Sequence, residues 1–130
     1  MVTNIIIIDD ERRSRALLRS MIESLNTTIN IVAEAYDIPT SIQAVQEYNP
    51  DLVFLDIQLK DGTGFDILHH FQQPDFKVIF ITAHNQYALE AFKVYAVDYL
   101  LKPVDKDQLS IAVTKALREI QLNQKEHHLH

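Results

Sequence analysis

The sequence IIIIDD at residues 5–10 sets the pattern from which the fold can be worked out. Four consecutive β-branched residues, without alternation of polar and apolar positions, are typical of a strand that is buried on both faces. Two carboxylates follow at its carboxyl end. The sequence LVFLD at residues 52–56 repeats this arrangement. Strands of this kind occur mainly in parallel sheets that are covered by helices on both faces.

Apolar runs and amphipathic segments alternate along the rest of the chain. Five strand–helix units of this kind predict an α/β fold, with a parallel five-stranded sheet between two layers of helices. The predicted strands span residues 5–8, 29–35, 52–55, 78–81 and 97–101, and the predicted helices span residues 16–25, 39–49, 65–71, 87–94 and a final segment from about residue 105.

Composition narrows the class of protein. The 130 residues fit one domain, and 47% hydrophobic with 23% charged residues is typical of a globular chain. The absence of cysteine excludes a disulfide framework, a thiolate zinc site and a cysteine nucleophile. A formal charge of -6 argues against direct binding of a nucleic acid backbone. No segment resembles a signal peptide or a membrane span, so we expect a cytoplasmic protein.

Polar side chains of related chemistry follow four of the five predicted strands. Asp9 and Asp10 follow the first strand, Asp56 the third, Thr82 the fourth and Lys102 the fifth. In a parallel sheet these ends lie at one pole, where ligands bind. Clustered carboxylates repel unless a cation lies between them, and oxygen ligands without histidine or cysteine suit Mg²⁺. The pattern therefore predicts a magnesium site at this pole.

The same residues predict phosphoryl chemistry. Mg²⁺ shares its coordination shell with phosphoryl oxygens, and a lysine and a threonine hydroxyl nearby would hold the remaining oxygens. Asp56 is then the candidate nucleophile of an aspartyl phosphate. Taken singly, Asp9, Asp10 or Asp56 is explained equally well as a turn or capping residue. Four strands that each deliver the required residue type at the same end favour a functional site.

On these residues the chain resembles the receiver domain of bacterial two-component response regulators, over nearly its whole length. The resemblance implies a flavodoxin-like (βα)5 three-layer sandwich with strand order 2-1-3-4-5. It also implies that a sensor histidine kinase donates a phosphoryl group to Asp56. The matching segments are IIDDE at 7–11, PDLVFLDI at 50–57, DG at 61–62, ITA at 81–83 and DYLLKP at 98–103.

The resemblance assigns a metal-binding role to four residues. Asp10 and Asp56 would ligate Mg²⁺, together with the main-chain carbonyl of Gln58. Asp9 would belong to the same acidic pocket, where it orients metal-bound water or ligates through it.

The resemblance also assigns the phosphoryl-binding groups. Thr82 would supply its hydroxyl and Lys102 its ammonium to the phosphoryl oxygens. The main-chain N–H groups of Ile57 and Ala83 would complete the cradle. The bond between Lys102 and Pro103 is expected to be cis, which X–Pro bonds allow.

Three further residues receive roles in switching and tuning. Tyr99 falls at the aromatic switch position of the family, which implies that Thr82 moves toward the phosphoryl group while Tyr99 turns inward. A half-buried aromatic residue without such a role is the alternative. Gln58 and His84 flank the expected phosphoryl site, at positions that tune how quickly water removes the phosphoryl group. For His84 the alternative is an exposed loop residue without a role.

A narrower resemblance, to receivers of the LytTR class, rests on HNQYALEAF at residues 84–92 and AVDYLLKP at residues 96–103. Such regulators carry a DNA-binding LytTR domain after the receiver, and it does not fit into the residues that follow here. We therefore expect a receiver domain at residues 1–122, cut from a longer regulator that forms a homodimer when phosphorylated and contacts DNA through its output domain. Residues 123–130 are interpreted as a tail that resembles part of a purification tag. A native histidine-rich tail and a stand-alone receiver are the alternatives.

Two other functions are compatible with parts of the pattern. A phosphatase of the haloacid dehalogenase type also forms an aspartyl phosphate, but it needs a second Asp two residues after the nucleophile, where this chain has Gln58. A phosphorylation-independent interaction module would use the fold only as a partner surface, and the complete set of site residues argues against it. We therefore expect a signalling domain that catalyses only its own phosphorylation and dephosphorylation.

Overall fold

The computed structural model describes residues 2–25 and 28–129, with side chains up to residue 124. Its strands and helices alternate as the sequence predicts, and one short hairpin is added. The elements are β1 (Thr3–Ile8), α1 (Arg12–Glu23), β2 (Ile29–Ala35), α2 (Ile38–Tyr48), β3 (Leu52–Leu55), β4 (Gln58–Leu59), β5 (Gly62–Thr63), α3 (Gly64–His70), β6 (Lys77–Thr82), α4 (Ala88–Lys93), β7 (Asp98–Leu101) and α5 (Lys106–Leu129).

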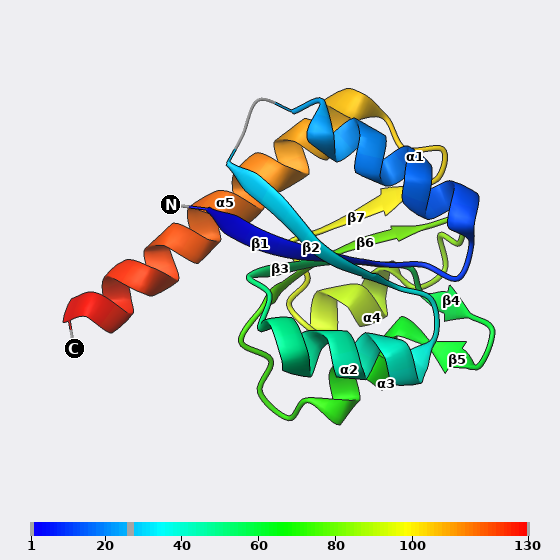
Figure 1. The fold of residues 1–130 in the computed structure, drawn as a ribbon, viewed down its shortest axis with the longest axis horizontal. Helices are drawn as coiled ribbons and strands as arrows, with labels where there is room; N and C mark the ends of the chain where they lie inside the picture. The colour runs from blue at the N-terminus through cyan, green and yellow to red at the C-terminus, as the bar shows by residue number, and fades with distance from the viewer. Residues whose placement is uncertain (1, 26–27, 130) are drawn as a thin grey trace.

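The main sheet has five parallel strands in the order β2-β1-β3-β6-β7. Because β4 and β5 form a separate antiparallel hairpin, β6 and β7 are the fourth and fifth strands of the main sheet. The predicted order 2-1-3-4-5 is therefore confirmed. Figure 1 shows α1 and α5 on one face of the sheet and α2, α3 and α4 on the other. The molecule is a three-layer sandwich.

Two hydrophobic clusters, one on each face of the sheet, explain why the strands have no alternating polar positions. On β1, Ile6 and Ile8 face the cluster under α2, α3 and α4, whereas Ile5 and Ile7 face the cluster under α1 and α5. All four side chains are at most 1% exposed. A strand buried on both faces must be apolar at every position.

The loop after β2 is held by a capping box at the start of α2. The carboxylate of Asp37 accepts hydrogen bonds from the main-chain N–H of Thr40 at 2.9 Å and from its hydroxyl at 2.6 Å. These bonds hold the pKa of Asp37 below its ordinary value. At the other end of the helix, Asn49 adopts a left-handed conformation with φ of 44°, directly before Pro50. The helix predicted for residues 39–49 is thus confirmed.

Gly64, the first residue of α3, packs directly against the loop that carries Asp56. Its N–H donates to the carbonyl of Ile57 at 2.7 Å. A Cβ at this position would lie 2.6 Å from the carbonyl oxygen of Asp56 and 2.9 Å from Cγ of Leu55. The absence of a side chain therefore lets α3 approach the end of β3.

Helix α5 is longer than the receiver domain predicted for residues 1–122 requires. It begins after Asp105, whose carboxylate accepts a hydrogen bond from the N–H of Gln108 at 2.9 Å. Its backbone continues without a break to Leu129, so the proposed tail is helical in its described part. Residue 130 lies outside the described residues. Among the described helices, none combines the length and the apolar character needed to cross a lipid bilayer.

Candidate functional site

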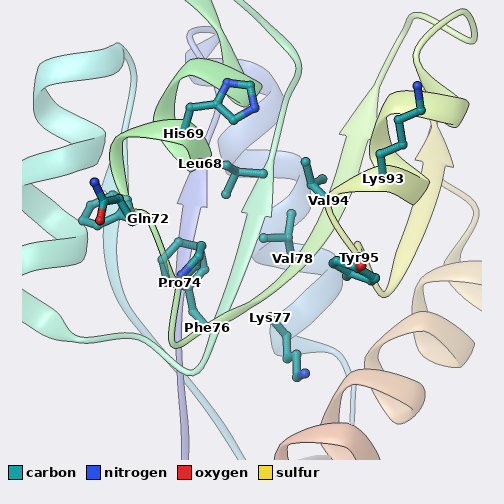
Figure 2. A pocket seen from close by; sticks show the side chains of 11 residues that line it. Leu68, His69, Gln72, Pro74, Phe76, Lys77, Val78, Lys93, Val94 and Tyr95 are labelled. Atoms are coloured by element: carbon teal, nitrogen blue, oxygen red, sulfur yellow. The ribbon is translucent and has the colours of Figure 1, made fainter.

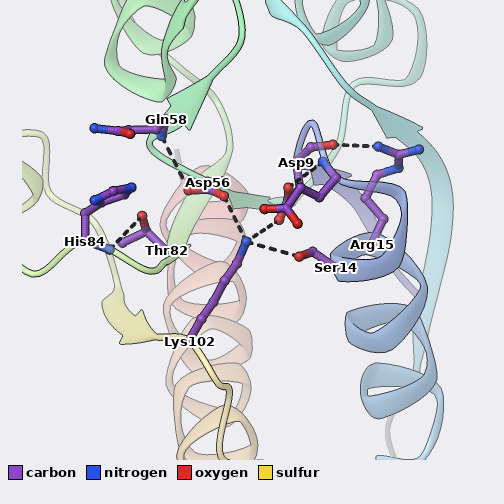
Figure 3. A network of polar contacts seen from close by, with 9 residues as sticks. Asp9, Ser14, Arg15, Asp56, Gln58, Thr82, His84 and Lys102 are labelled. Carbon is purple, nitrogen blue, oxygen red and sulfur yellow. Dashed lines mark hydrogen bonds and ion pairs between the residues drawn. The ribbon is translucent and has the colours of Figure 1, made fainter.

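Four of the predicted site residues meet at the carboxyl pole of the sheet. Asp9 and Asp56 directly follow β1 and β3, Thr82 ends β6 and Lys102 directly follows β7. The ammonium of Lys102 donates to Oδ2 of Asp9 at 2.7 Å and to Oδ2 of Asp56 at 2.9 Å (Figure 3). The parallel sheet thus brings together residues from three strand ends that are far apart in the sequence.

A cluster of carboxylates occupies this pole. One carboxylate oxygen from each of Asp9, Asp10 and Asp56 lies within 4.8 Å of the others. Asp9 and Asp56 are buried, whereas Asp10 is half-buried. Lys102 is the one ammonium within hydrogen-bond distance of Asp9 and Asp56 in the described structure. A set of oxygen ligands with surplus negative charge fits a hard divalent cation.

Burial and hydrogen bonding act in opposite directions on these groups. Burial raises the pKa of Asp9, and hydrogen bonds from Lys102 and from the N–H of Glu11 offset this only in part. Burial alone would lower the pKa of Lys102, but its bonds to Asp9 and Asp56 raise it. One ammonium contacts two carboxylates. The raised pKa of Lys102 favours its charged form, whereas the raised pKa of Asp9 disfavours its charged form. Lys102 remains a cation at neutral pH.

Two main-chain N–H groups, of Gln58 and His84, complete the immediate surroundings of Asp56 and Thr82. The N–H of Gln58 approaches Oδ1 of Asp56 at 3.4 Å. Thr82 is fully buried, and its hydroxyl accepts a hydrogen bond from the N–H of His84 at 3.3 Å. The roles predicted for the N–H groups of Ile57 and Ala83, and for the carbonyl of Gln58, remain predictions.

Tyr99 lies beside the site with its ring packed inward. The ring centroid is 6.1 Å from that of Phe80, and the hydroxyl donates to the main-chain carbonyl of His84. Burial raises the pKa of the Tyr99 phenol. The movement predicted for Tyr99 remains a prediction. The bond between Lys102 and Pro103 is cis, as the resemblance predicts.

Three residues at the site were not anticipated from the sequence. The hydroxyl of Ser14 lies 3.3 Å from the ammonium of Lys102. The guanidinium of Arg15 donates to the carbonyl of Asp9 at 2.7 Å. The hydroxyl of Tyr87 accepts a hydrogen bond from the side-chain amide of Gln58 at 3.2 Å. No residue spacing signals these contacts, because they depend on how the helices pack on the sheet.

A separate cavity of about 410 Å³ lies between α3 and α4, near the start of β6. Its walls include Leu68, Val78 and Tyr95, and none of the predicted site residues lines it. Figure 2 shows the side chains of Lys77 and Lys93 directed toward opposite ends of the cavity. Because these ammonium groups do not converge, the cavity has no focused charge, and the candidate site is the carboxylate pole.

Comparison with known families agrees with this geometry. A family model described as the response regulator receiver domain matches residues 5–114. The chain belongs to the receiver domain family. The receiver is a signalling domain, and the resemblance inferred from the sequence is confirmed.

Two curated proteins named as sensory transduction proteins are similar to this chain. The sensory transduction protein LytT of Enterococcus faecalis is 38% identical over 120 residues, covering 90% of this chain and 49% of that protein. The LytT protein of Bacillus cereus is 36% identical over 120 residues, covering 90% and 48%. The chain therefore spans about half the length of the curated relatives it matches.

Solved receiver structures share the fold. The receiver domain of AraT from Geobacillus stearothermophilus has a TM-score of 0.86 and 28% identity, covering 95% of this chain and 99% of that one. The response regulatory domain of protein mrkE from Klebsiella pneumoniae has a TM-score of 0.83 and 26% identity, covering 92% and 98%. The predicted flavodoxin-like architecture is therefore confirmed.

Proposed function

We propose that this receiver accepts a phosphoryl group on Asp56 from a sensor histidine kinase and so controls an output surface. The observation that carries the proposal is the geometry around one ammonium. Lys102 lies within 3 Å of carboxylate oxygens of both Asp9 and Asp56, in a pocket with surplus negative charge. Such a pocket offers a nucleophile and a group that holds phosphoryl oxygens.

The donor set suits Mg²⁺ as the cation of this pocket. Asp10 and Asp56, with the main-chain carbonyl of Gln58, would hold the ion, and Asp9 would act through a water molecule. When bound, Mg²⁺ offsets the repulsion between the carboxylates and the incoming phosphoryl group. The support is that all contributing side chains are oxygen ligands whose carboxylates lie within 4.8 Å of one another.

In the proposed reaction, a carboxylate oxygen of Asp56 forms a bond to phosphorus while the bond to the imidazole nitrogen of the donor phosphohistidine breaks. The ammonium of Lys102 then exchanges its contact with Asp56 for phosphoryl oxygens. The hydroxyl of Thr82 turns from the N–H of His84 toward the same group. These exchanges bias the position of Tyr99 and of α4.

A surface beside the site is suited to a phosphodonor partner. A cavity of about 340 Å³ lies between α1 and the segment after β7, and its lining includes Asp9, Lys102 and Leu17. Leu17 is 59% exposed. An apolar contact next to the carboxylates would hold a kinase helix close to Asp56.

The proposal extends to an output through α4 and to a longer regulator. The side chains of Leu89, Phe92 and Tyr95 are 67%, 78% and 89% exposed, which suits a surface that pairs with a second copy after phosphorylation. The relatives named LytT support a LytTR-type output domain outside residues 1–122, through which DNA would be bound. The acidic receiver itself would not contact DNA.

The phosphoacceptor is tested with the purified protein, Mg²⁺ and acetyl phosphate as donor. We expect mass spectrometry to locate a phosphoryl group on Asp56, and we expect none on that peptide in Asp56→Asn. Asp107→Asn, which removes an exposed carboxylate from α5, is the matched control and should be labelled like the parent. Thermal melting of each variant shows that it is folded.

Other outcomes separate the alternatives. Equal labelling of the parent and Asp56→Asn would exclude Asp56 as the acceptor. Repeated hydrolysis of a phosphate ester would instead support a phosphatase. A folded protein that neither binds Mg²⁺ nor takes up label would support an interaction module that does not depend on phosphorylation.

A further inference from the structure

Tyr87 contacts the side chains of Gln58 and His84, which lie beside Asp56 on the side away from Asp9. The side-chain amide of Gln58 donates to the Tyr87 hydroxyl at 3.2 Å, across 29 residues of sequence. The ring of His84 meets the ring of Tyr87 edge-on, with 6.4 Å between centroids and an interplanar angle of 81°. One residue thus links the loop after β3 to the loop after β6.

Gln58 and His84 also contact the site itself through their main chains. The N–H of Gln58 approaches Oδ1 of Asp56, and the N–H of His84 donates to the hydroxyl of Thr82. Figure 3 shows both side chains on one side of Asp56, whereas Asp9 and Ser14 lie on the other. On the side of Asp9, the cavity proposed above for the phosphodonor partner lies beside Lys102. The side with Gln58 and His84 is therefore a second approach by which water reaches Asp56.

The position of Tyr87 is itself well determined. Its ring centroid lies 6.2 Å from that of Phe65 in α3. The residue also packs against the hydrophobic cluster between the sheet and helices α2, α3 and α4. It directly precedes α4, and its side chain does not cap that helix. A phenol anchored in this way presents its hydroxyl at a fixed place.

We propose that Tyr87 is a positioning residue that holds the Gln58 amide and the His84 ring across the approach of water to the phosphoryl group on Asp56. This inference rests on the proposed function. In the step concerned, the oxygen of water forms a bond to phosphorus, and the bond between phosphorus and the Asp56 carboxylate oxygen breaks. The carboxylate leaves with the bonding electrons, a proton passes to solvent and inorganic phosphate is released.

Loss of the Tyr87 hydroxyl frees the Gln58 side chain, because the amide then keeps no partner on the facing loop. A free side chain rotates away from the site and admits water. We therefore expect Tyr87→Phe to shorten the lifetime of the phosphoryl group by about two- to tenfold, the range that the loss of one hydrogen bond produces. The ring contacts with Phe65 and His84 persist in this variant.

The test compares the parent, Tyr87→Phe, Gln58→Ala and the double variant. Each protein is labelled with acetyl phosphate and Mg²⁺, the donor is removed, and the label on Asp56 is followed by mass spectrometry. Tyr48→Phe, at an exposed tyrosine that ends α2, is the matched control and should keep the parental lifetime. Because Tyr87 acts through Gln58, Tyr87→Phe should add little to the effect of Gln58→Ala.

A second measurement needs neither phosphorylation nor metal. In the unphosphorylated protein, the side-chain amide resonances of Gln58 should shift in Tyr87→Phe and stay unchanged in Tyr48→Phe. Unchanged resonances, an unchanged lifetime or fully additive effects in the double variant would each overturn the role of Tyr87. A parent protein that takes no label on Asp56 would instead overturn the proposed function, and this inference with it.

Discussion

The ammonium nitrogen of Lys102 lies 2.9 Å from Oδ2 of Asp56, although 46 residues separate the two in the sequence. The same nitrogen lies 2.7 Å from Oδ2 of Asp9. Lys102 therefore neutralises part of the negative charge of the carboxylate cluster. On the proposed function, Lys102 would compete with a metal ion for these oxygens and would become available to phosphoryl oxygens once Asp56 is modified.

Replacement of Lys102 by alanine separates these two effects. We expect Lys102→Ala to bind Mg²⁺ with a dissociation constant lower by about tenfold, since removal of one positive charge a few ångströms away favours a second cation. Labelling of Asp56 by acetyl phosphate should nevertheless fall. Calorimetric titration with Mg²⁺ measures the first effect. Lys106→Ala removes an exposed lysine of α5 and should change neither quantity, and weaker Mg²⁺ binding in Lys102→Ala would contradict the competition.

Asp10 offers a test of the proposed metal site. Its side chain is half-buried and forms no hydrogen bond or ion pair among the described residues, so we expect Asp10→Asn to fold like the parent. Mg²⁺ should raise the melting temperature of the parent, because a ligand that binds only the folded state stabilises it. This rise should be reversed by a chelator and should be absent in Asp10→Asn. A rise of equal size in Asp10→Asn and in the control Asp107→Asn would argue against Asp10 as a ligand.

Replacement of Gly64 by alanine tests whether the stability of the fold depends on the close approach of α3 to the loop of Asp56. A methyl group there meets the carbonyl oxygen of Asp56 at 2.6 Å, so the helix or the loop must move. We expect Gly64→Ala to lower the free energy of unfolding by about 1–3 kcal/mol, as overpacking does elsewhere. Chemical denaturation measures it, with Ser110→Ala on exposed α5 as the control. A variant as stable as the parent would show that the loop of Asp56 moves aside without a loss of stability.

The capping carboxylate of Asp37 gives a pH dependence with a defined sign. Its pKa is lowered in the folded protein by the bonds from Thr40. The ionised group therefore contributes stability above its unfolded pKa near 3.8, and this contribution is lost as the pH falls through the lower folded value. We expect Asp37→Asn to be less stable than the parent at pH 7 and to lose that difference at pH 2–3. Melting temperatures at both pH values check this, and a constant difference would exclude the ionised cap.

The sequence was sufficient to predict the sheet and the principal site because both depend on runs of residues. Four consecutive isoleucines fit a strand that is buried on both faces. The residues that directly follow parallel strands lie at the same edge of the sheet. Asp9, Asp56 and Lys102 were therefore predicted together. The cis bond before Pro103 followed from the family resemblance alone.

Other features have no such local signature. The hairpin of β4 and β5 has two residues in each strand, too few for any periodicity. Helix α1 begins at Arg12, four residues before the first apolar position that indicated a helix. Ser14 and Arg15 lie in this polar first turn, so their contacts with Lys102 and Asp9 were not anticipated. The contact of Tyr87 with Gln58 depends on the packing of two loops and could not be read from spacing.

Helix α5 runs back across the sheet, away from the carboxylates. Figure 1 shows the beginning of β1 and the end of α5 on the same side of the molecule, opposite the hairpin and the carboxyl ends of the strands. A fluorescent protein fused at either end, or a linker to a sensor chip, would therefore extend from the far side. The domain can be mounted as a biosensor for phosphodonors with its reactive pole open to the solution.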